Sequence, residues 1–74
     1  MANVRFARFG EEATTLQIDK EVVTVGDVLE AAEVEADLEG KEKDAVQVNG
    51  DNATEETVVP EGAIVTLIPH TKLG

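Results

Sequence analysis

The stretch Thr24-Val25-Gly26-Asp27-Val28-Leu29-Glu30-Ala31-Ala32 is where the hydrophobic pattern of the chain changes from a period of two to that of a helix. Its apolar residues recur at i, i+3, i+4 and i+7 and therefore share one helical face: Val25, Val28, Leu29 and Ala32. Thr24 is a favourable N-cap residue, and Asp27 three residues later can complete a capping box. The pattern predicts a helix from about Val25 to Glu35.

Two stretches before this helix alternate with a period of two, which is typical of half-buried strands. The first runs from Asn3 to Phe9 and the second from Thr14 to Asp19. The polar segment Gly10-Glu11-Glu12 between them has the right length for a hairpin connection. We therefore expect two antiparallel strands. Arg5 has the opposite parity to the apolar residues of its strand and is expected to face solvent.

After the helix, the residues predict two further strands. Ala45–Val48 is a short strand that the Asn49-Gly50 turn closes, and the polar segment from Asp51 to Thr57 is expected to be an irregular connection. Pro60-Glu61-Gly62 predicts a second turn. Ala63–Ile68 is apolar at five of six positions, so it is expected to be a strand covered on both sides.

The resulting order is strand, strand, helix, strand, strand. One helix with one apolar stripe covers one face of a sheet, so we expect a two-layer α+β domain with a mixed, four-stranded sheet. The first and last strands are expected to lie side by side at the centre. The domain is expected to span residues 1–69, and residues 70–74 are expected to form a flexible tail.

The charge of the chain narrows the classes of partner. Among 74 residues, 16 acidic residues oppose six basic ones, and the formal net charge is −10. This charge repels nucleic-acid phosphates and anionic membrane surfaces, so we expect neither as a partner. A protein with a basic face is the expected counterpart, although acidic residues also serve solubility alone. No apolar run approaches the roughly 20 residues of a membrane span, and no signal peptide is recognised, so the expected location is the cytoplasm.

The residues also disfavour an enzyme. The sequence contains no cysteine, no phosphate-binding loop and no Ser/His/Asp set, and we expect no cofactor. His70 is the sole histidine and is interpreted as a solvated residue or a contact with a partner. The acidic runs 37–44 and 51–56 lack the order of ligands in a calcium loop, so they are interpreted as solvated charge rather than metal sites.

Three motifs resemble those of the small sulfur-carrier proteins of thiamine and molybdopterin synthesis, which have the ubiquitin-like β-grasp fold. Thr24–Leu29 is similar to their T-V-x-D-L-L helix start, and Val46–Gly50 is similar to their V-x-V-N-G strand and turn. Val59–Pro69 is similar to their L-x-D-G-D-x-V-x-L-x-P ending. The resemblance spans residues 13–69 and implies a β-grasp fold with the order ββαββ.

The resemblance also implies a function at the end of the chain. In this family a separate enzyme uses ATP to adenylate the C-terminal glycine carboxylate, which then becomes a thiocarboxylate; related modifiers are joined to a lysine instead. Gly74 is the corresponding residue, and glycine suits this role because it lacks Cβ. The family ends in Gly-Gly, whereas Leu73 precedes Gly74 here. This difference keeps open the alternative of an interaction module or subunit with no chemistry at its tail.

The exposed sheet face of a β-grasp modifier recognises partners through a few apolar residues. The last predicted strand has two apolar sides: Ile64, Thr66 and Ile68 on one, and Ala63, Val65 and Leu67 on the other. Parity alone leaves open which side faces the helix. The candidate partner-binding residues are Ile64, Thr66, Ile68, His70 and Leu73.

Overall fold

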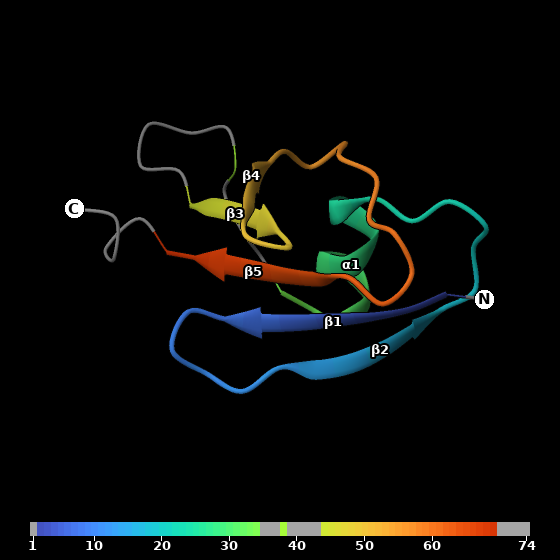
Figure 1. Ribbon diagram of the computed structural model, residues 1–74, viewed down its shortest axis with the longest axis horizontal. Helices are drawn as coiled ribbons and strands as arrows, with labels where there is room; N and C mark the ends of the chain where they lie inside the picture. The colour runs from blue at the N-terminus through green and yellow to red at the C-terminus, as the bar shows by residue number, and fades with distance from the viewer. Residues whose placement is uncertain (1, 35–37, 39–43, 70–74) are drawn as a thin grey trace.

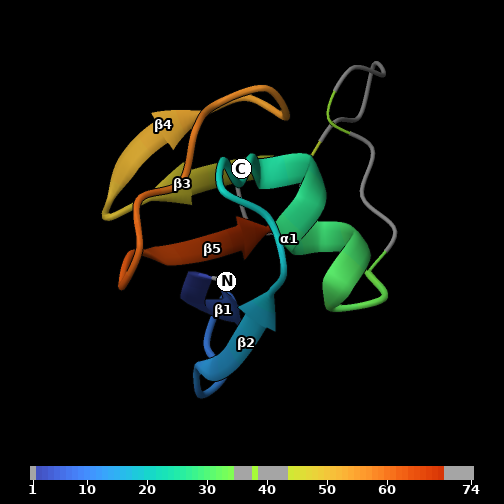
Figure 2. The ribbon, with the colours of Figure 1, turned by 90° about the vertical axis from the view of Figure 1, so that its right-hand side faces the viewer.

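The protein folds into a five-stranded sheet with one helix packed on it, as described for residues 2–34, 38 and 44–69 in a computed structural model. The elements are β1 (Ala2–Arg8), β2 (Thr14–Ile18), α1 (Val25–Ala31), β3 (Ala45–Val48), β4 (Asp51–Ala53) and β5 (Ile64–Ile68). The strands lie in the order β2-β1-β5-β3-β4 (Figure 1). Viewed from the side, the sheet and α1 form two layers (Figure 2). The predicted α+β, β-grasp architecture is confirmed.

The first and last strands pair at the centre of the sheet, as the sequence predicts. β1 and β5 run parallel, with Arg5 opposite Ile64 and Arg8 opposite Leu67. The other neighbours are antiparallel: β1 with β2, β3 with β5, and β3 with β4. The sheet is therefore mixed, and β5 has a strand on either side of it.

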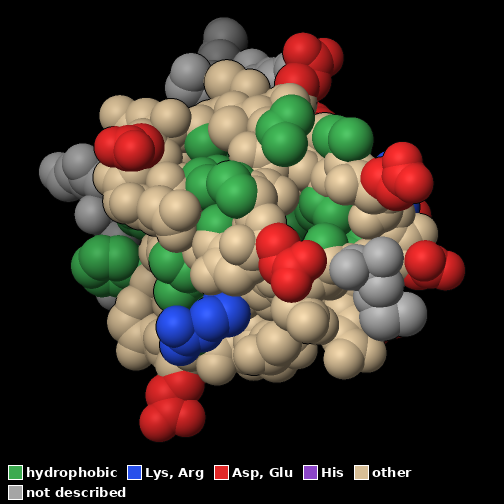
Figure 3. Space-filling model, turned by 45° about the vertical axis from the view of Figure 1, so that its right-hand side comes forward, with side chains coloured by type: hydrophobic (Ala, Val, Ile, Leu, Met, Phe, Trp, Pro, Cys, Tyr) green, Lys and Arg blue, Asp and Glu red, His purple; other side chains and the backbone are tan. Residues whose placement is uncertain are grey.

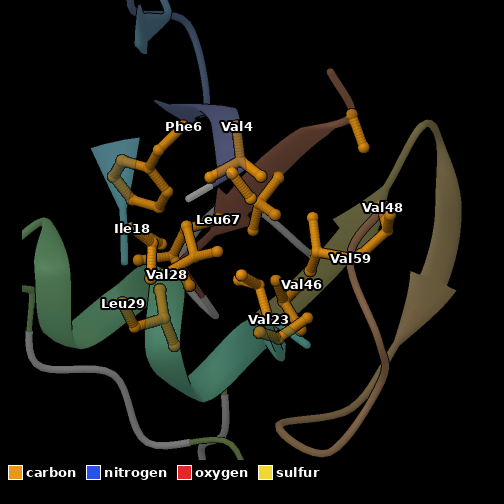
Figure 4. Close-up of a cluster of buried hydrophobic side chains, with 14 residues drawn as sticks. Val4, Phe6, Ile18, Val23, Val28, Leu29, Val46, Val48, Val59 and Leu67 are labelled. Carbon is orange, nitrogen blue, oxygen red and sulfur yellow. The ribbon is translucent and has the colours of Figure 1, made fainter. Parts of the chain in front are cut away.

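The hydrophobic core fills the space between the two layers. Val4 and Val65 from the sheet and Val25 and Val28 from the helix are fully buried, each with 0% exposure. Larger side chains such as Phe6 complete the cluster (Figure 4). The helical face predicted from the sequence is therefore the face that packs on the sheet.

The start of α1 has the capping box that the sequence predicts. The Thr24 hydroxyl accepts a hydrogen bond from the Asp27 amide (3.3 Å), and the Asp27 carboxylate accepts one from the Thr24 amide (3.0 Å). Two further amides of the first turn donate to the segment before β5: Val25 to the Thr57 carbonyl (3.0 Å) and Gly26 to the Glu55 carbonyl (2.9 Å). A Cβ atom on Gly26 would lie 3.0 Å from Glu55 Cγ, so glycine allows this close approach.

The helix ends earlier than the predicted Glu35. Its last residue is Ala31, and Glu33 has a positive φ of 57°. The Glu33 amide donates to the Glu30 carbonyl and the Val34 amide to the Leu29 carbonyl, both at 3.0 Å. These two bonds form a Schellman motif, which stops the helix. The prediction was wrong because this turn commonly contains glycine, and here the residue is a glutamate.

The strand count also differs from the prediction, since the sheet has five strands instead of four. Asn49 and Gly50 both have positive φ (53° and 87°), which the two-residue hairpin turn requires. This turn leads directly into β4, which pairs with β3 with Val48 opposite Asp51 and Val46 opposite Ala53. The prediction of an irregular connection from Asp51 to Thr57 is therefore wrong for its first three residues, which are strand β4.

Strand β5 is covered on one side only, contrary to the expectation for Ala63–Ile68. Val65 and Leu67 are buried under α1, whereas Ile64, Thr66 and Ile68 are half-buried on the opposite side. Among the described residues α1 is the one helix, and it lies on one face, so the second apolar side of β5 stays partly exposed to solvent.

Candidate functional site

The sheet presents one face away from α1, which we call the outer face. Alternate residues of the five strands point to it because successive side chains in a strand point to opposite sides. Figure 1 looks onto this face, with the helix behind the sheet. The strand residues of the outer face are Asn3, Arg5, Ala7, Thr15, Gln17, Ala45, Gln47, Asn52, Ile64, Thr66 and Ile68.

The outer face is nearly neutral, although the chain is strongly acidic. Arg5 is the charged member of this set, and no acidic residue of the described part of the chain belongs to it. In the oblique view of Figure 3, hydrophobic side chains lie across the visible surface with a basic side chain below them, one acidic side chain lies near the middle, and the other carboxylates lie towards the rim. Such a surface can lie against another protein without bringing carboxylates into the contact.

Three of the candidate partner-binding residues lie together on this face. Ile64, Thr66 and Ile68 form a row along β5, which we call the β5 stripe. The neighbouring strands place small or uncharged side chains beside two of them: Ala45 opposite Ile68, and Gln47 opposite Thr66. The stripe is therefore a low, accessible line of mostly aliphatic surface through the middle of the sheet.

Phe9 is a candidate contact that the sequence reasoning missed. Its amide donates to the Leu67 carbonyl (2.8 Å), which continues the β1–β5 register and places Phe9 beside Ile68. The side chain is 54% exposed, an unusual state for phenylalanine. The signal in the sequence was a large aromatic residue directly before the glycine of a turn, where no core position is expected.

The tail candidates lie outside the described residues. Strand β5 ends at Ile68, Pro69 follows it, and His70, Leu73 and Gly74 are not part of the described structure. The chain leaves the sheet at the end of its central strand, where Phe9 also lies. The β5 stripe thus points to the place where the tail begins.

Comparison with known protein families identifies the family of the chain. A family model described as the ThiS family matches residues 5–71. The protein belongs to the ThiS family. ThiS-family members are small β-grasp sulfur carriers, so the resemblance of the three motifs is confirmed, and the carrier class takes precedence over the alternative of a plain interaction module. No curated protein and no solved structure matches the chain.

In this ThiS-family protein, the V-x-V-N-G motif does more than form a turn. The Asn49 side-chain oxygen accepts a hydrogen bond from the Ile64 amide (3.1 Å), and the Asn49 amide donates to the Ile64 carbonyl (2.9 Å). The turn therefore holds the first residue of the β5 stripe in register. Sequence reasoning identified the turn but not this contact, which joins residues far apart in the chain.

An acidic hollow beside the start of α1 is a separate feature. It is lined by Thr24, Gly26, Asp27, Glu30, Thr54, Glu55 and Glu56. Within the described ranges, no group of three or more His, Asp or Glu side chains is placed to hold a metal ion. The carboxylate of Asp27 has a structural role, because it completes the capping box and pairs with Lys20 Nζ at 2.9 Å.

Because of these contacts, the stability of this ThiS-family protein should decrease at acid pH. The hydrogen bond from the Thr24 backbone, with help from Lys20, lowers the pKa of Asp27 below its ordinary value of 3.8. Ionised Asp27 therefore stabilises the fold above about pH 4, and this contribution is lost as the pH falls through the lowered pKa. We expect the free energy of unfolding of Asp27→Asn to fall less steeply than that of the native protein as the pH drops below about 4.

Urea unfolding at a series of pH values measures this dependence. Lys20→Gln removes the ion pair but leaves the capping box, so it should reduce the dependence only in part. Identical pH profiles for the native protein and Asp27→Asn would contradict the assignment.

No helix among the described residues is long and apolar enough to cross a membrane.

Proposed function

We propose that this protein is a carrier whose Gly74 carboxylate is activated by a separate adenylating enzyme. The match to the ThiS family over residues 5–71 carries the proposal, because it makes the chain a sulfur carrier of the ubiquitin-like type. The sequence supplies a glycine at position 74, shortly after the central strand β5. A cytoplasmic location stays a prediction from the sequence.

The proposed reaction uses the tail of this chain and the active site of its partner. A Gly74 carboxylate oxygen attacks the α-phosphorus of ATP bound by the enzyme, an O–P bond forms, and pyrophosphate leaves. Hydrosulfide then attacks the acyl carbon, a C–S bond forms, the C–O bond to the phosphate breaks and AMP leaves. The product is a thiocarboxylate at Gly74, and no change of oxidation state is needed. A glycine at this position keeps the carbonyl unhindered because it has no Cβ atom.

The outer face supplies the proposed docking surface for the adenylating enzyme. Its β5 stripe offers aliphatic contact area, and exposed Phe9 adds an aromatic side chain at the end from which the tail leaves. Interfaces are commonly apolar at the centre and polar at the rim. The partner is therefore expected to cover the stripe with apolar groups and to direct basic groups towards the surrounding carboxylates, which speeds and orients association.

Gly74→Ala is the direct test of this function. With the adenylating enzyme and ATP, the native protein should give pyrophosphate and an adenylate adduct, detected by intact mass. The variant should react at least about tenfold more slowly, which corresponds to about 1.4 kcal/mol in the barrier. Lys72→Ala, two residues earlier, should react at the native rate because it leaves the carbonyl unchanged.

The mass of the protein isolated from its own host completes the test. A thiocarboxylate at Gly74 supports sulfur transfer, and an isopeptide from Gly74 to a lysine supports conjugation. A single unmodified mass, with a stable partner co-purified, would contradict the proposal and leave the interaction module. Leu73 is the observation that favours that second function, because the family has glycine there. If the protein is a carrier, Leu73→Gly should maintain or increase the rate of activation.

A further inference from the structure

The strand at one edge of the sheet, β2, lacks the features that block pairing with a further strand. Edge strands in natural proteins are commonly protected by a charged residue, a proline or a bulge. β2 reads Thr14-Thr15-Leu16-Gln17-Ile18 and contains neither a charge nor a proline. Its register with β1 is continuous from Ile18 opposite Ala2 to Thr14 opposite Phe6, so it has no bulge. Figure 1 shows β2 at the lower edge of the sheet.

The backbone groups of Thr15 and Gln17 point away from the sheet. The Arg5 amide donates to the Ala63 carbonyl (2.9 Å), on the β5 side of β1. Backbone bonding alternates between the two sides along a strand, so Thr15, opposite Arg5, directs its own N–H and C=O away from β1. Gln17, opposite Asn3, has the same orientation. These two residues can form the ladder of hydrogen bonds with an added strand.

A shallow hollow lies beside this edge, between β2 and the end of α1. Its lining includes Leu16 from β2 and Ala32 and Val34 from the turn after the helix. We call these three residues the β2 groove. They are half-buried and pack on the core, so part of their apolar surface still faces solvent. Every second side chain of an added strand would lie over this groove.

Acidic residues flank β2 at both ends. Glu11 and Glu12 precede it, and Asp19 and Glu21 follow it, all of them exposed. Lys20 lies between the latter two but is ion-paired with a carboxylate of α1 at 2.9 Å. A strand bound here therefore has carboxylates near each of its ends, which favours a segment with basic residues at those positions.

The same charges argue against a second copy of this chain. Antiparallel pairing of β2 with β2 of another copy would bring Glu11 and Glu12 of each copy towards Asp19 and Glu21 of the other. Arg8, which also lines the hollow, offsets a single charge at this end. Each copy also carries a net charge of −10, which adds to the repulsion. The occupant that fits is a different protein.

We propose that β2 binds an extended segment of a partner protein by strand addition, with an apolar residue over the β2 groove and Lys or Arg at both ends. The segment bonds through its backbone to Thr15 and Gln17, and its charge pattern matches the acidic flanks. Strand β1 lies between this edge and the β5 stripe, so the two binding surfaces are on different strands of the sheet. The protein can therefore hold a second partner at β2 while the first covers the β5 stripe.

Two synthetic peptides test this edge on the full-length protein: Lys-Lys-Thr-Val-Thr-Val-Thr-Lys-Lys and the same sequence with Glu in place of each Lys. Amide hydrogen exchange is followed by NMR. The lysine peptide should slow exchange at Thr15 and Gln17 by at least about tenfold, the change expected from new backbone bonds. Unchanged exchange at both residues at millimolar peptide, or equal protection by the glutamate peptide, would overturn the proposal.

Variants of the edge sharpen the result. Gln17→Pro removes an outward-facing amide at a position where an edge strand tolerates proline, and Gln17→Thr is its matched control. The Kd of the proline variant for the lysine peptide should be at least about tenfold higher than that of the native protein, whereas the Kd of the control should lie within about twofold of the native value. Glu11→Lys combined with Glu12→Lys leaves the backbone unchanged and should weaken the lysine peptide while strengthening the glutamate peptide.

Two further outcomes have a clear meaning. A native dimer in sedimentation that Gln17→Pro dissociates would overturn the proposal in favour of self-association. Loss of activation in Gly74→Ala with native peptide binding would show that binding at β2 does not depend on the chemistry at Gly74, so either proposal can fail without the other.

Discussion

Of the single substitutions in β5 that remove about two methyl groups, Val65→Ala should lower the free energy of unfolding most. Val65 has 0% exposure, and it lies on the central strand where sheet and helix meet. Removing two methyl groups from such a position costs about 2–3 kcal/mol, since the cavity collapses only in part. The free energy of unfolding of a small domain is about 5–15 kcal/mol, so this loss is a large fraction.

Urea unfolding at neutral pH measures the effect, and Val22→Ala provides a matched control. The chemical change is identical, but Val22 is 59% exposed, so its loss should be within about 0.5 kcal/mol. Equal losses in the two variants would contradict the burial of Val65 and, with it, the assignment of the helix-facing side of β5.

Ile68→Glu should have the largest effect on the proposed interaction with the adenylating enzyme. Ile68 lies at the end of the β5 stripe, opposite Ala45 and beside exposed Phe9. A carboxylate buried there would have to give up water without a basic partner. A few residues of an interface contribute about 2 kcal/mol or more to binding, and we expect Ile68 to be one of them, so Kd should rise by at least about tenfold.

Isothermal titration with the enzyme gives Kd directly, and unfolding of each variant shows whether the fold is retained. Val22→Glu places the same charge on an exposed valine outside the outer face and should bind within about twofold of the native protein. A native Kd for a folded Ile68→Glu variant would exclude the β5 stripe from the interface. The chemistry proposed for Gly74 would then need another docking surface.

The parts of the fold that the sequence predicts are those that local patterns specify. Thr24 and Asp27 predict the capping box, and the spacing of the apolar residues predicts the buried face of the helix. The hairpin turn follows from Asn49-Gly50, because both positions need positive φ. Each of these features depends on residues only a few positions apart, and each is found in the structure.

The missed features depend on contacts between distant segments or on unusual residues. Strand β4 is three polar or small residues, Asp51–Ala53, whose strand conformation comes from pairing with β3. Glu33 ends the helix with a positive φ, a conformation that is not expected for glutamate. The orientation of β5 could not be predicted because both of its sides are apolar. Packing of α1 against the whole sheet decides that the β5 stripe faces outwards.

The parallel pairing of β1 with β5 has a consequence for how the protein is made. β1 is the first strand synthesised and β5 the last, and Arg5 reaches its partner Ile64 only after most of the chain exists. Contacts between residues so far apart in sequence form slowly, because a long loop must close first. The β1–β2 hairpin therefore has one edge of β1 unpaired until β5 has been made and has reached it. Until then this edge can pair with another chain, so a newly made molecule is exposed to aggregation and is a target for chaperones.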